Sequence, residues 1–380
     1  MTEDATYIDP LNAALRTYLK DAVRVTIKNP SQALFFVRML RSQKKAVRTR
    51  QAWDRQGLHV PPFLIASVTN RCNLRCKGCY AQAHAKTRSP SVEMSEDKLW
   101  SIFDEARELG ISAILLAGGE PLVRRDLLTI THDFPELMFP VVTNGTLLDD
   151  TLIQQLKQQR NVWPVLSIEG HEYDTNQRRG AAIYQRVHSM MSLLKEKGVF
   201  FGCSLTVTSL NIHIITDRGF IQSLIDKGCR LFFFVEYVSI ADDTKDWVLT
   251  EEQRADLLAA TEDFRSTLPG LFIAFPGDEE QFGGCLAAGR DFVHISPEGN
   301  LEPCPFSPYS DTSLTDVSLK EGLQSPLLKT IRQNHEQLSE TAGGCALWTE
   351  REWVLSLLAS PATTKTGVIV SVDSLIREAE

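Results

Sequence analysis

Short apolar runs alternate with longer amphipathic segments through the middle of the chain, from Pro62 onward. The apolar runs have the length of buried strands, and the segments between them repeat apolar residues at helical spacing. Such alternation is typical of a parallel sheet covered by helices, and six units of it predict an α/β fold with an open partial (β/α)6 TIM-like barrel. The expected strands are Phe63–Val68, Ala113–Leu116, Phe139–Thr143, Val162–Ile168, Phe200–Val207 and Leu231–Val238. The expected helices are Ser95–Leu109, Asp149–Gln159, Ala182–Lys197 and Ile214–Lys227.

The segments on either side of this region have a different pattern. Residues 1–60 repeat apolar residues at helical spacing and are interrupted at Asn29-Pro30, so they predict a helical N-terminal extension whose second helix is capped by Ser31. Residues 250–270 predict one more helix, which closes a barrel domain of residues 61–272. Residues 273–380 begin with a stretch rich in glycine and proline, which predicts a small second domain.

The composition is that of an ordinary globular protein, with 43% hydrophobic and 23% charged residues. The 380 residues suffice for a barrel and a smaller second domain. We find no apolar run long enough to span a bilayer and no start that resembles a signal peptide. The formal net charge of −8 gives no general case for nucleic-acid binding.

The charge is unevenly distributed along the chain. The segment from Arg16 to Arg50 holds ten basic residues and one acidic residue, Asp21, and so carries +9. The remainder carries −17, because the whole chain carries −8. A basic amphipathic helix of this kind can make a peripheral contact with an anionic membrane or bind RNA. The alternative, which we favour from the sequence, is a helical extension that packs its apolar side on the barrel and leaves its cations in water.

Three cysteines lie close together directly after the first expected strand. Cys72, Cys76 and Cys79 follow C-x3-C-x2-C spacing inside one polar loop, so their thiols can turn toward one point. Thiolates are soft ligands that suit an iron–sulfur cluster or zinc. The alternatives are a zinc knuckle that lacks its fourth ligand and three unrelated buried thiols. Clustered cysteines in a chain without a leader indicate metal ligands in a reducing cytoplasm, so we expect a cytoplasmic protein.

The cysteine loop, including the aromatic Tyr80 after its third cysteine, resembles the cluster loop of the radical S-adenosylmethionine (SAM) enzymes. The resemblance implies that Cys72, Cys76 and Cys79 hold a 4Fe–4S cluster whose fourth iron binds SAM. It also implies that an electron from the cluster cleaves SAM to a 5′-deoxyadenosyl radical, which abstracts a substrate hydrogen. Reduced flavodoxin or ferredoxin is the electron donor that this family leads us to expect.

Further segments at the ends of expected strands resemble the same family. Gly118, Gly119 and Glu120, in Ala117-Gly118-Gly119-Glu120-Pro121, are similar to the segment that binds the SAM ammonium group. Asn144 lies in a turn similar to that after the family's third strand, although a plain Asn-Gly turn is the alternative. Ser167 ends the fourth strand, and the resemblance implies that it contacts the SAM ribose or carboxylate.

The next polar residues follow the fourth and fifth expected strands. Glu169 stands where many members of the family have aspartate, so the role of that acid is not carried over. Arg178-Arg179-Gly180 resembles the family's Arg-Gly segment, and we expect Arg179 to bind the SAM carboxylate through its planar guanidinium, with Arg178 as the second choice and a surface ion pair as the alternative. On the fifth strand, Thr206 or Ser204 is expected beside the adenosine.

The sixth expected strand ends with Glu236 and Tyr237, which we expect to be a catalytic acid or a hydrogen relay facing the substrate. The alternative for Tyr237 is packing alone. Cys203 and Cys229 are expected to be buried core thiols without a ligand role.

The C-terminal region holds three more cysteines. Cys285 and Cys304 form a C-x13-G-x4-C pattern, and Cys345 follows Gly343-Gly344. The pattern resembles the SPASM or shortened Twitch domain, which implies one auxiliary 4Fe–4S cluster held by these three thiolates. Thr341 stands where a full SPASM domain has a further cysteine, and Asp291 is a candidate fourth ligand. A zinc site is the alternative, although no C-x2-C pair lies nearby.

The sequence therefore predicts a radical SAM enzyme that acts on either a small molecule or a peptide. We recognise no separate peptide-binding domain, which slightly favours the small molecule. The alternative class is a non-catalytic iron–sulfur or electron-transfer protein, which would make no 5′-deoxyadenosine.

Overall fold

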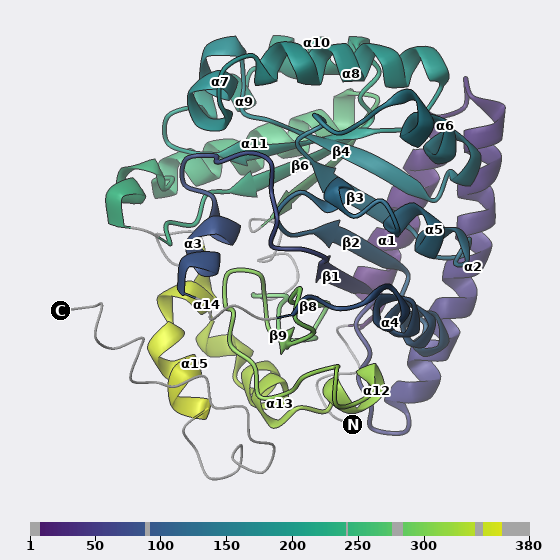
Figure 1. Cartoon of the computed structure of the whole chain (residues 1–380), viewed down its shortest axis with the longest axis vertical. Coiled ribbons are helices and arrows are strands. Elements are labelled where there is room, and N and C mark those ends of the chain that lie inside the picture. The colour runs from purple at the N-terminus through teal and green to yellow at the C-terminus, as the bar shows by residue number, and fades with distance from the viewer. Residues whose placement is uncertain (1–7, 88–91, 241, 276–283, 339–344, 359–380) are drawn as a thin grey trace.

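A nine-stranded sheet, curled into a half-barrel, forms the centre of the computed structural model, which describes residues 8–87, 92–240, 242–275, 284–338 and 345–358 (Figure 1). The strand order is β7-β6-β5-β4-β3-β2-β1-β8-β9, and every neighbouring pair is parallel except β8 and β9. The strands are β1 Phe63–Ser67, β2 Ala113–Ala117, β3 Phe139–Thr143, β4 Val162–Ile168, β5 Gly202–Val207, β6 Leu231–Glu236, β7 Leu271–Phe275, β8 Phe292–Ile295 and β9 Leu301–Glu302.

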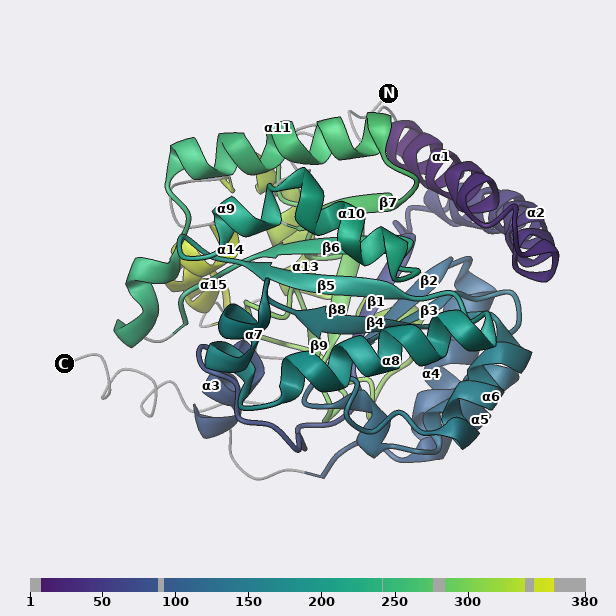
Figure 2. The same ribbon diagram turned by 90° about the horizontal axis from the view of Figure 1, so that it is seen from above.

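Helices follow most of the strands and cover the outer side of the half-barrel (Figure 2). In the N-terminal half they are α1 Ile8–Val25, α2 Pro30–Asp54, α3 Tyr80–Thr87, α4 Glu96–Leu109, α5 Leu127–His132, α6 Asp150–Gln159 and α7 Glu172–Arg179. Next come α8 Ile183–Lys197, α9 Ile212–Ile215, α10 Arg218–Asp226 and α11 Glu251–Thr267. The C-terminal helices are α12 Leu319–Gly322, α13 Pro326–Gln333, α14 Ala346–Thr349 and α15 Arg351–Leu358, and short 3-10 turns are η2 Pro121–Val123, η3 Asp242–Trp247 and η5 His335–Gln337.

The predicted half-barrel is confirmed, and its sheet continues past the six expected strands. β7 extends one edge, and β8 and β9 extend the other edge through the pairing of β8 with β1. The C-terminal region is thus joined to the barrel through its sheet. A sequence pattern gives strand length and burial but not pairing, which explains why these three strands were not expected in this sheet.

Two local predictions were wrong. The single helix expected over 214–227 is two helices, α9 and α10, because the carboxylate of Asp217 accepts from the backbone N–H of Phe220 and starts a new helix. The cap of α2 is Asn29 rather than Ser31. Asn29 Oδ1 accepts from the N–H of Gln32 at 3.3 Å, and Pro30 occupies the first helical position, where its missing N–H costs nothing.

The α1–α2 hairpin closes the amino-terminal end of the half-barrel. Its buried apolar side packs on residues at the starts of the strands, among them Ala113, Trp163, Leu231 and Leu271. The aromatic ring of Phe36 lies 5.3 Å from Trp163 and 5.2 Å from Phe200, centroid to centroid. In both views the hairpin and α3 lie on opposite sides of the molecule (Figures 1 and 2).

The end of α2 is fixed to the barrel by a buried arginine. Arg50 Nη1 donates to the carbonyl oxygen of Gly110 and to Ser112 Oγ, the latter at 2.9 Å. Burial lowers the pKa of Arg50 to about 10, partly offset by the charge of Asp291, so the guanidinium stays protonated at neutral pH. Among the residues that the structure describes, we find no helix with both the length and the hydropathy needed to cross a bilayer.

A chain of three buried polar side chains ties the C-terminal ribbon to the barrel. Ser67 Oγ of β1 lies 2.8 Å from His294 Nε2 of β8, and His294 Nδ1 lies 2.7 Å from Glu302 Oε2 of β9. All three side chains are buried, so these hydrogen bonds satisfy polar groups that water does not reach.

Candidate cluster and cofactor site

The cysteine loop leaves β1 at the carboxyl end of the sheet, where (β/α) barrels hold their chemistry. Cys72, Cys76 and Cys79 are half-buried thiols, and burial raises the pKa of Cys72 and of Cys76. The charges of the three thiolates act on one another, so the three side chains are neighbours. Within the described ranges, however, no three His, Cys, Asp or Glu side chains converge on one point as the ligands of a metal ion do.

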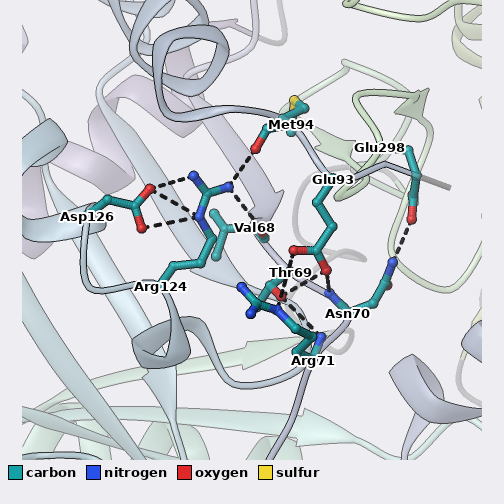
Figure 3. A network of polar contacts seen from close by, with 9 residues as sticks. All are labelled: Val68, Thr69, Asn70, Arg71, Glu93, Met94, Arg124, Asp126 and Glu298. Carbon is teal, nitrogen blue, oxygen red and sulfur yellow. Dashed lines mark hydrogen bonds and ion pairs between the residues drawn. The ribbon is translucent and has the colours of Figure 1, made fainter.

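A polar network fixes the residues that precede the first cysteine (Figure 3). Both oxygens of Glu93 accept from Thr69 Oγ1, at 2.9 and 3.0 Å, and one of them also accepts from the backbone N–H of Asn70 at 2.7 Å. Asn70 Nδ2 donates to Glu298 Oε1 at 2.5 Å, which joins the loop to the C-terminal region. Arg124 Nη1 donates to the carbonyl of Met94 at 2.8 Å, so the segment that carries Glu93 is held in turn.

Sequence reasoning missed Glu93, Arg124 and Glu298. Glu93 comes just before the helix-capping segment that begins at Met94, and Arg124 stands three residues after Pro121 in the glycine-rich segment. In the sequence, none of the three residues differs from an ordinary surface charge. Their proximity to the motifs was the only available signal, and it does not identify the contacts.

Gly118 and Gly119 lie directly under the cysteine loop. A Cβ on Gly118 would be 2.5 Å from the carbonyl oxygen of Thr69, and one on Gly119 would be still nearer to that of Arg71. The N–H of Gly119 donates to Thr69 O at 2.7 Å, and that of Glu120 to Arg71 O at 2.9 Å. Glycine is therefore required here because two stretches of backbone touch.

Glu120 is a buried carboxylate that connects the ends of β2 and β3. Its oxygens accept from Thr143 Oγ1 at 2.7 Å, the N–H of Asn144 at 2.8 Å and the N–H of Leu122 at 3.1 Å. Burial raises the pKa of Glu120, although these three hydrogen bonds act in the opposite direction. Asn144 in turn donates from Nδ2 to Asn73 Oδ1 in the cysteine loop at 2.9 Å.

Glu169 joins the two arginines at the end of α7. Its Oε1 accepts from Arg178 Nη1 at 2.6 Å and from Arg179 Nε at 2.6 Å. Arg178 Nη1 also donates to Thr206 Oγ1 at 3.0 Å, and Arg179 Nη1 lies 4.0 Å from Cys76 Sγ. Burial acts to raise the pKa of Glu169, but the two guanidinium charges outweigh it and lower that pKa.

The remaining predicted residues surround this group. Ser167 is buried on β4, paired in register with Ser204 of β5. The Tyr237 hydroxyl donates to Thr244 Oγ1 at 2.7 Å and lies over Gly78 in the cysteine loop. Glu236, by contrast, accepts from Arg254 Nε of α11 at 3.0 Å, in an ion pair with the outer helix layer.

The three C-terminal cysteines are buried near one another. All three are buried, and the side chains of Cys345 and Cys285 act on Cys304 as neighbours. Burial, reinforced by these neighbours, raises the pKa of Cys304 well above its ordinary value. The ring of Phe306 lies 5.2 Å from that of Tyr80, so the second group of cysteines adjoins the first loop. Thr341, Gly343 and Gly344 lie outside the described residues.

The last two cysteines are buried in the core, as expected, and the structure places them side by side. Cys203 and Cys229 are fully buried, and their sulfurs are 3.4 Å apart.

The residues present fit an iron–sulfur cluster and a polar cofactor. Thiol donors in one loop are the ligand set of such clusters, and burial raises the pKa of Cys76 although the nearby Arg179 guanidinium acts in the opposite direction. In addition, Glu169 Oε2 and Arg178 Nε are buried without a hydrogen-bond partner, in the part of the chain that is described. Since buried polar atoms nearly always have a partner, this acceptor and this donor suit the polar groups of a bound molecule.

The protein thus belongs to the class of α/β half-barrels that carry a three-cysteine loop after the first strand. Polar groups stand at the ends of the next strands. The family described as Radical SAM superfamily matches residues 66–224. The PqqA peptide cyclase of Granulibacter bethesdensis is 24% identical over 64% of this chain and 68% of that protein. The AdoMet-dependent heme synthase of Methanosarcina barkeri is 26% identical over 75% of this chain and 88% of that protein.

The fold has solved relatives as well. Streptococcus suis SuiB bound to S-adenosylmethionine aligns with a TM-score of 0.62 and 18% identity, covering 77% of this chain and 72% of SuiB. Residues 66–224 of this chain thus match a radical SAM domain, and the named relatives are enzymes. A domain of this family implies SAM and an iron–sulfur cluster as cofactors.

Proposed function

We propose that this enzyme holds a 4Fe–4S cluster through Cys72, Cys76 and Cys79 and binds SAM at the iron left without a thiolate. A four-iron cluster normally takes four ligands, and this loop supplies three. When bound, the cluster and SAM supply a 5′-deoxyadenosyl radical, which takes a hydrogen atom from the substrate.

The polar residues at the strand ends then have distinct tasks. A carboxylate has about four acceptor positions, and Glu120 uses three, so it can accept one more hydrogen bond from the SAM ammonium group. Gly118 and Gly119 let the cysteine loop approach Glu120. Asn144 fixes Asn73 beside the first cysteine.

The second half of the cofactor site is the arginine pair. Arg179 uses Nε and Nη2 for Glu169, which leaves Nη1, near Cys76, to bind the SAM carboxylate. The unpartnered Oε2 of Glu169 can accept from a ribose hydroxyl. Ser167 and Thr206 line the neighbouring strands, and the aromatic rings of Tyr80 and Tyr237 flank the loop. Glu236 remains a prediction as a catalytic acid.

A second cluster is proposed for the C-terminal region, in a SPASM- or Twitch-like site. Cys285, Cys304 and Cys345 would hold it, supported by their burial and proximity. Such a cluster would accept an electron from the substrate or hold the substrate in place. The charge of Asp291 acts on Arg50, so that carboxylate already has a cationic neighbour.

The observation that carries this proposal is the meeting of the cysteine loop, Glu120 and Arg179 at the carboxyl ends of β1 to β4. The test is anaerobic reconstitution followed by iron and sulfide counts and an assay for 5′-deoxyadenosine. Two four-iron clusters correspond to about eight irons per chain, and one to about four.

Cysteine variants separate the two sites. Replacing Cys72, Cys76 and Cys79 with alanine should remove about four irons and abolish 5′-deoxyadenosine, because no cluster remains to reduce SAM. Replacing Cys285, Cys304 and Cys345 should also remove about four irons but leave some SAM cleavage. Cys203→Ala is the matched control and should keep the full iron count. A reconstituted, reduced wild-type protein that makes no 5′-deoxyadenosine would refute the proposal.

The substrate is proposed to be a small molecule or a peptide, since the relatives include a heme synthase and a peptide cyclase by name. Candidate substrates can be ranked by the shift they cause in the cluster's spectrum. Reduced flavodoxin or ferredoxin is the proposed electron donor, and either should replace a chemical reductant in the assay.

A further inference from the structure

The outward sides of α1 and α2, with the turn between them, carry a dense set of cations. They are Arg16, Lys20, Arg24, Lys28, Arg38, Arg41, Lys44, Lys45 and Arg48, all exposed, and we call them the basic face. None of these nine side chains makes an ion pair or a side-chain hydrogen bond within the described part of the molecule. The packing of the hairpin on the barrel therefore uses the opposite sides of both helices and leaves the basic face uncompensated.

Helical geometry explains why the basic face points away from the protein. In α1 the buried positions 15, 19 and 22 fall on one side, and positions 16, 20 and 24 fall near the opposite side at 100° per residue. In α2 the buried positions 32, 36, 39 and 43 are likewise opposite to 38, 41, 45 and 48. Both rows of cations thus face solvent.

Large apolar side chains stand exposed among these cations. Ile27 is 71% exposed in the turn between the helices, and Leu34 is 52% exposed on α2, one turn before Arg38. Leu34 and Arg38 also line a pocket of about 390 Å³ between α2 and the end of α6, whose lining includes both Arg160 and the acidic Glu136. Exposed aliphatic side chains beside cations match the chemistry of an anionic lipid surface.

We propose that the basic face, with Ile27 and Leu34, docks this protein on an anionic lipid bilayer. Cations are attracted to the negative surface, and aliphatic side chains at the same level enter the headgroup boundary. Single-stranded RNA would instead be expected to meet exposed aromatic rings on which bases stack. The exposed aromatic side chains of the described residues, Trp100 and Tyr173, lie on α4 and α7 rather than on the hairpin.

The position of the hairpin suits this role. The segment from Arg16 to Arg50 carries +9 while the rest of the chain carries −17, so an anionic surface attracts one side of the molecule and repels the other. The hairpin covers the amino ends of the strands, on the side opposite α3 (Figures 1 and 2). Docking would therefore leave the carboxyl ends of the strands turned away from the lipid.

The test is co-sedimentation of the full-length protein with vesicles of phosphatidylcholine alone or with phosphatidylglycerol. We expect binding only to the anionic vesicles, and we expect its loss at high salt, because the attraction between the charges is screened. Each Lys or Arg near such a surface contributes on the order of fivefold in affinity, so replacing Arg41, Lys44 and Lys45 with glutamine should weaken binding at least tenfold. Leu34→Ser should weaken binding at unchanged charge.

Matched controls keep the result interpretable. Replacing Lys157, Lys195 and Lys329 with glutamine removes the same charge from exposed positions on α6, α8 and α13, and Leu210→Ser removes a leucine that is 60% exposed elsewhere. Neither control should change binding, and circular dichroism should show that all variants are folded. Absence of vesicle binding by the wild type, or equal losses in the basic-face and control variants, would overturn the proposal. So would RNA binding that is lost in the basic-face variant while no vesicles are bound.

Discussion

Arg179 and Glu169 form a buried ion pair at the mouth of the half-barrel, with Arg179 Nε 2.6 Å from Glu169 Oε1. The position that departs from the family's aspartate is therefore bound to the residue expected to hold the SAM carboxylate. Since Arg178 shares the same oxygen, one carboxylate orients both guanidinium groups. Glu169 thus helps to place Arg179 near Cys76.

The first prediction concerns this pair. Glu169→Gln removes the carboxylate charge with which both arginines pair, and breaking a buried pair in this way costs about 3 kcal/mol. We expect a clear fall in melting temperature and weaker SAM binding, measured by thermal denaturation and by titration calorimetry. Glu172 is exposed and lies on α7, the helix that carries both arginines. Glu172→Gln should leave the melting temperature and SAM binding unchanged. Equal behaviour of the two variants would show that the pair is dispensable.

The second prediction concerns the cysteine loop and Tyr237. A Cβ on Gly78 would lie 2.5 Å from the Tyr237 hydroxyl oxygen, and Gly78 has a positive φ of 62°. Gly57 has a positive φ of 81° but open space around it, so Gly57→Ala should cost only about 1 kcal/mol. We expect Gly78→Ala to lower the free energy of unfolding by more than Gly57→Ala does, and also to lower the iron content after reconstitution.

Tyr237→Phe supplies the control for that substitution. Removing the hydroxyl relieves the contact, so the double variant should recover part of the stability lost by Gly78→Ala. A double-mutant cycle with zero coupling would mean that Tyr237 does not support the loop.

The third prediction concerns the polar chain from β1 to β9. His294→Leu removes the contacts of the ring with both Glu302 and Ser67 from a buried site, and we expect a loss of about 3 kcal/mol in the free energy of unfolding. Ser67→Ala removes one hydrogen bond and should cost about 1 kcal/mol. Adding Glu302→Gln to His294→Leu should restore some stability, since the buried charge is then gone. Urea denaturation measures all three, and no recovery in the double variant would contradict this account.

The fourth prediction concerns pH. Burial, with a smaller contribution from the charge of Lys227, lowers the pKa of His188 to about 4, and its Nε2 is buried without a hydrogen bond. The pKa of His188 is lower in the folded state than in the unfolded state. His188 therefore does not change the free energy of unfolding above about pH 6.5, and it lowers that free energy increasingly as the pH falls toward 4.

His188→Gln removes that titration. The difference in unfolding free energy between wild type and variant should change by about 1 kcal/mol between pH 7.5 and pH 5, after allowance for solvent screening of this half-buried ring. Urea denaturation at the two pH values measures it. An identical difference at both values would mean that the ring is solvated.

Much of the barrel could be predicted from the sequence because each buried strand is a short apolar run. β3 and β4 begin and end at the predicted residues, and α11 lies within the helix predicted from position 250. The gathering of the cysteine loop and Glu120 at one edge also followed from the sequence, since the carboxyl ends of parallel strands lie together. The local pattern of residues was sufficient to predict both the strands and helices and the edge of the sheet at which the site lies.

The sequence by itself determined the strand–helix alternation, the three-cysteine loop and the cationic character of the N-terminal helices, because each is a property of neighbouring residues. Only the tertiary structure decided that β8 pairs with β1, that Glu169 binds both arginines and that Glu236 pairs with Arg254. These contacts join residues distant in sequence or depend on the direction of a side chain. Such choices are made by the free energy of packing the whole chain, which no local pattern contains.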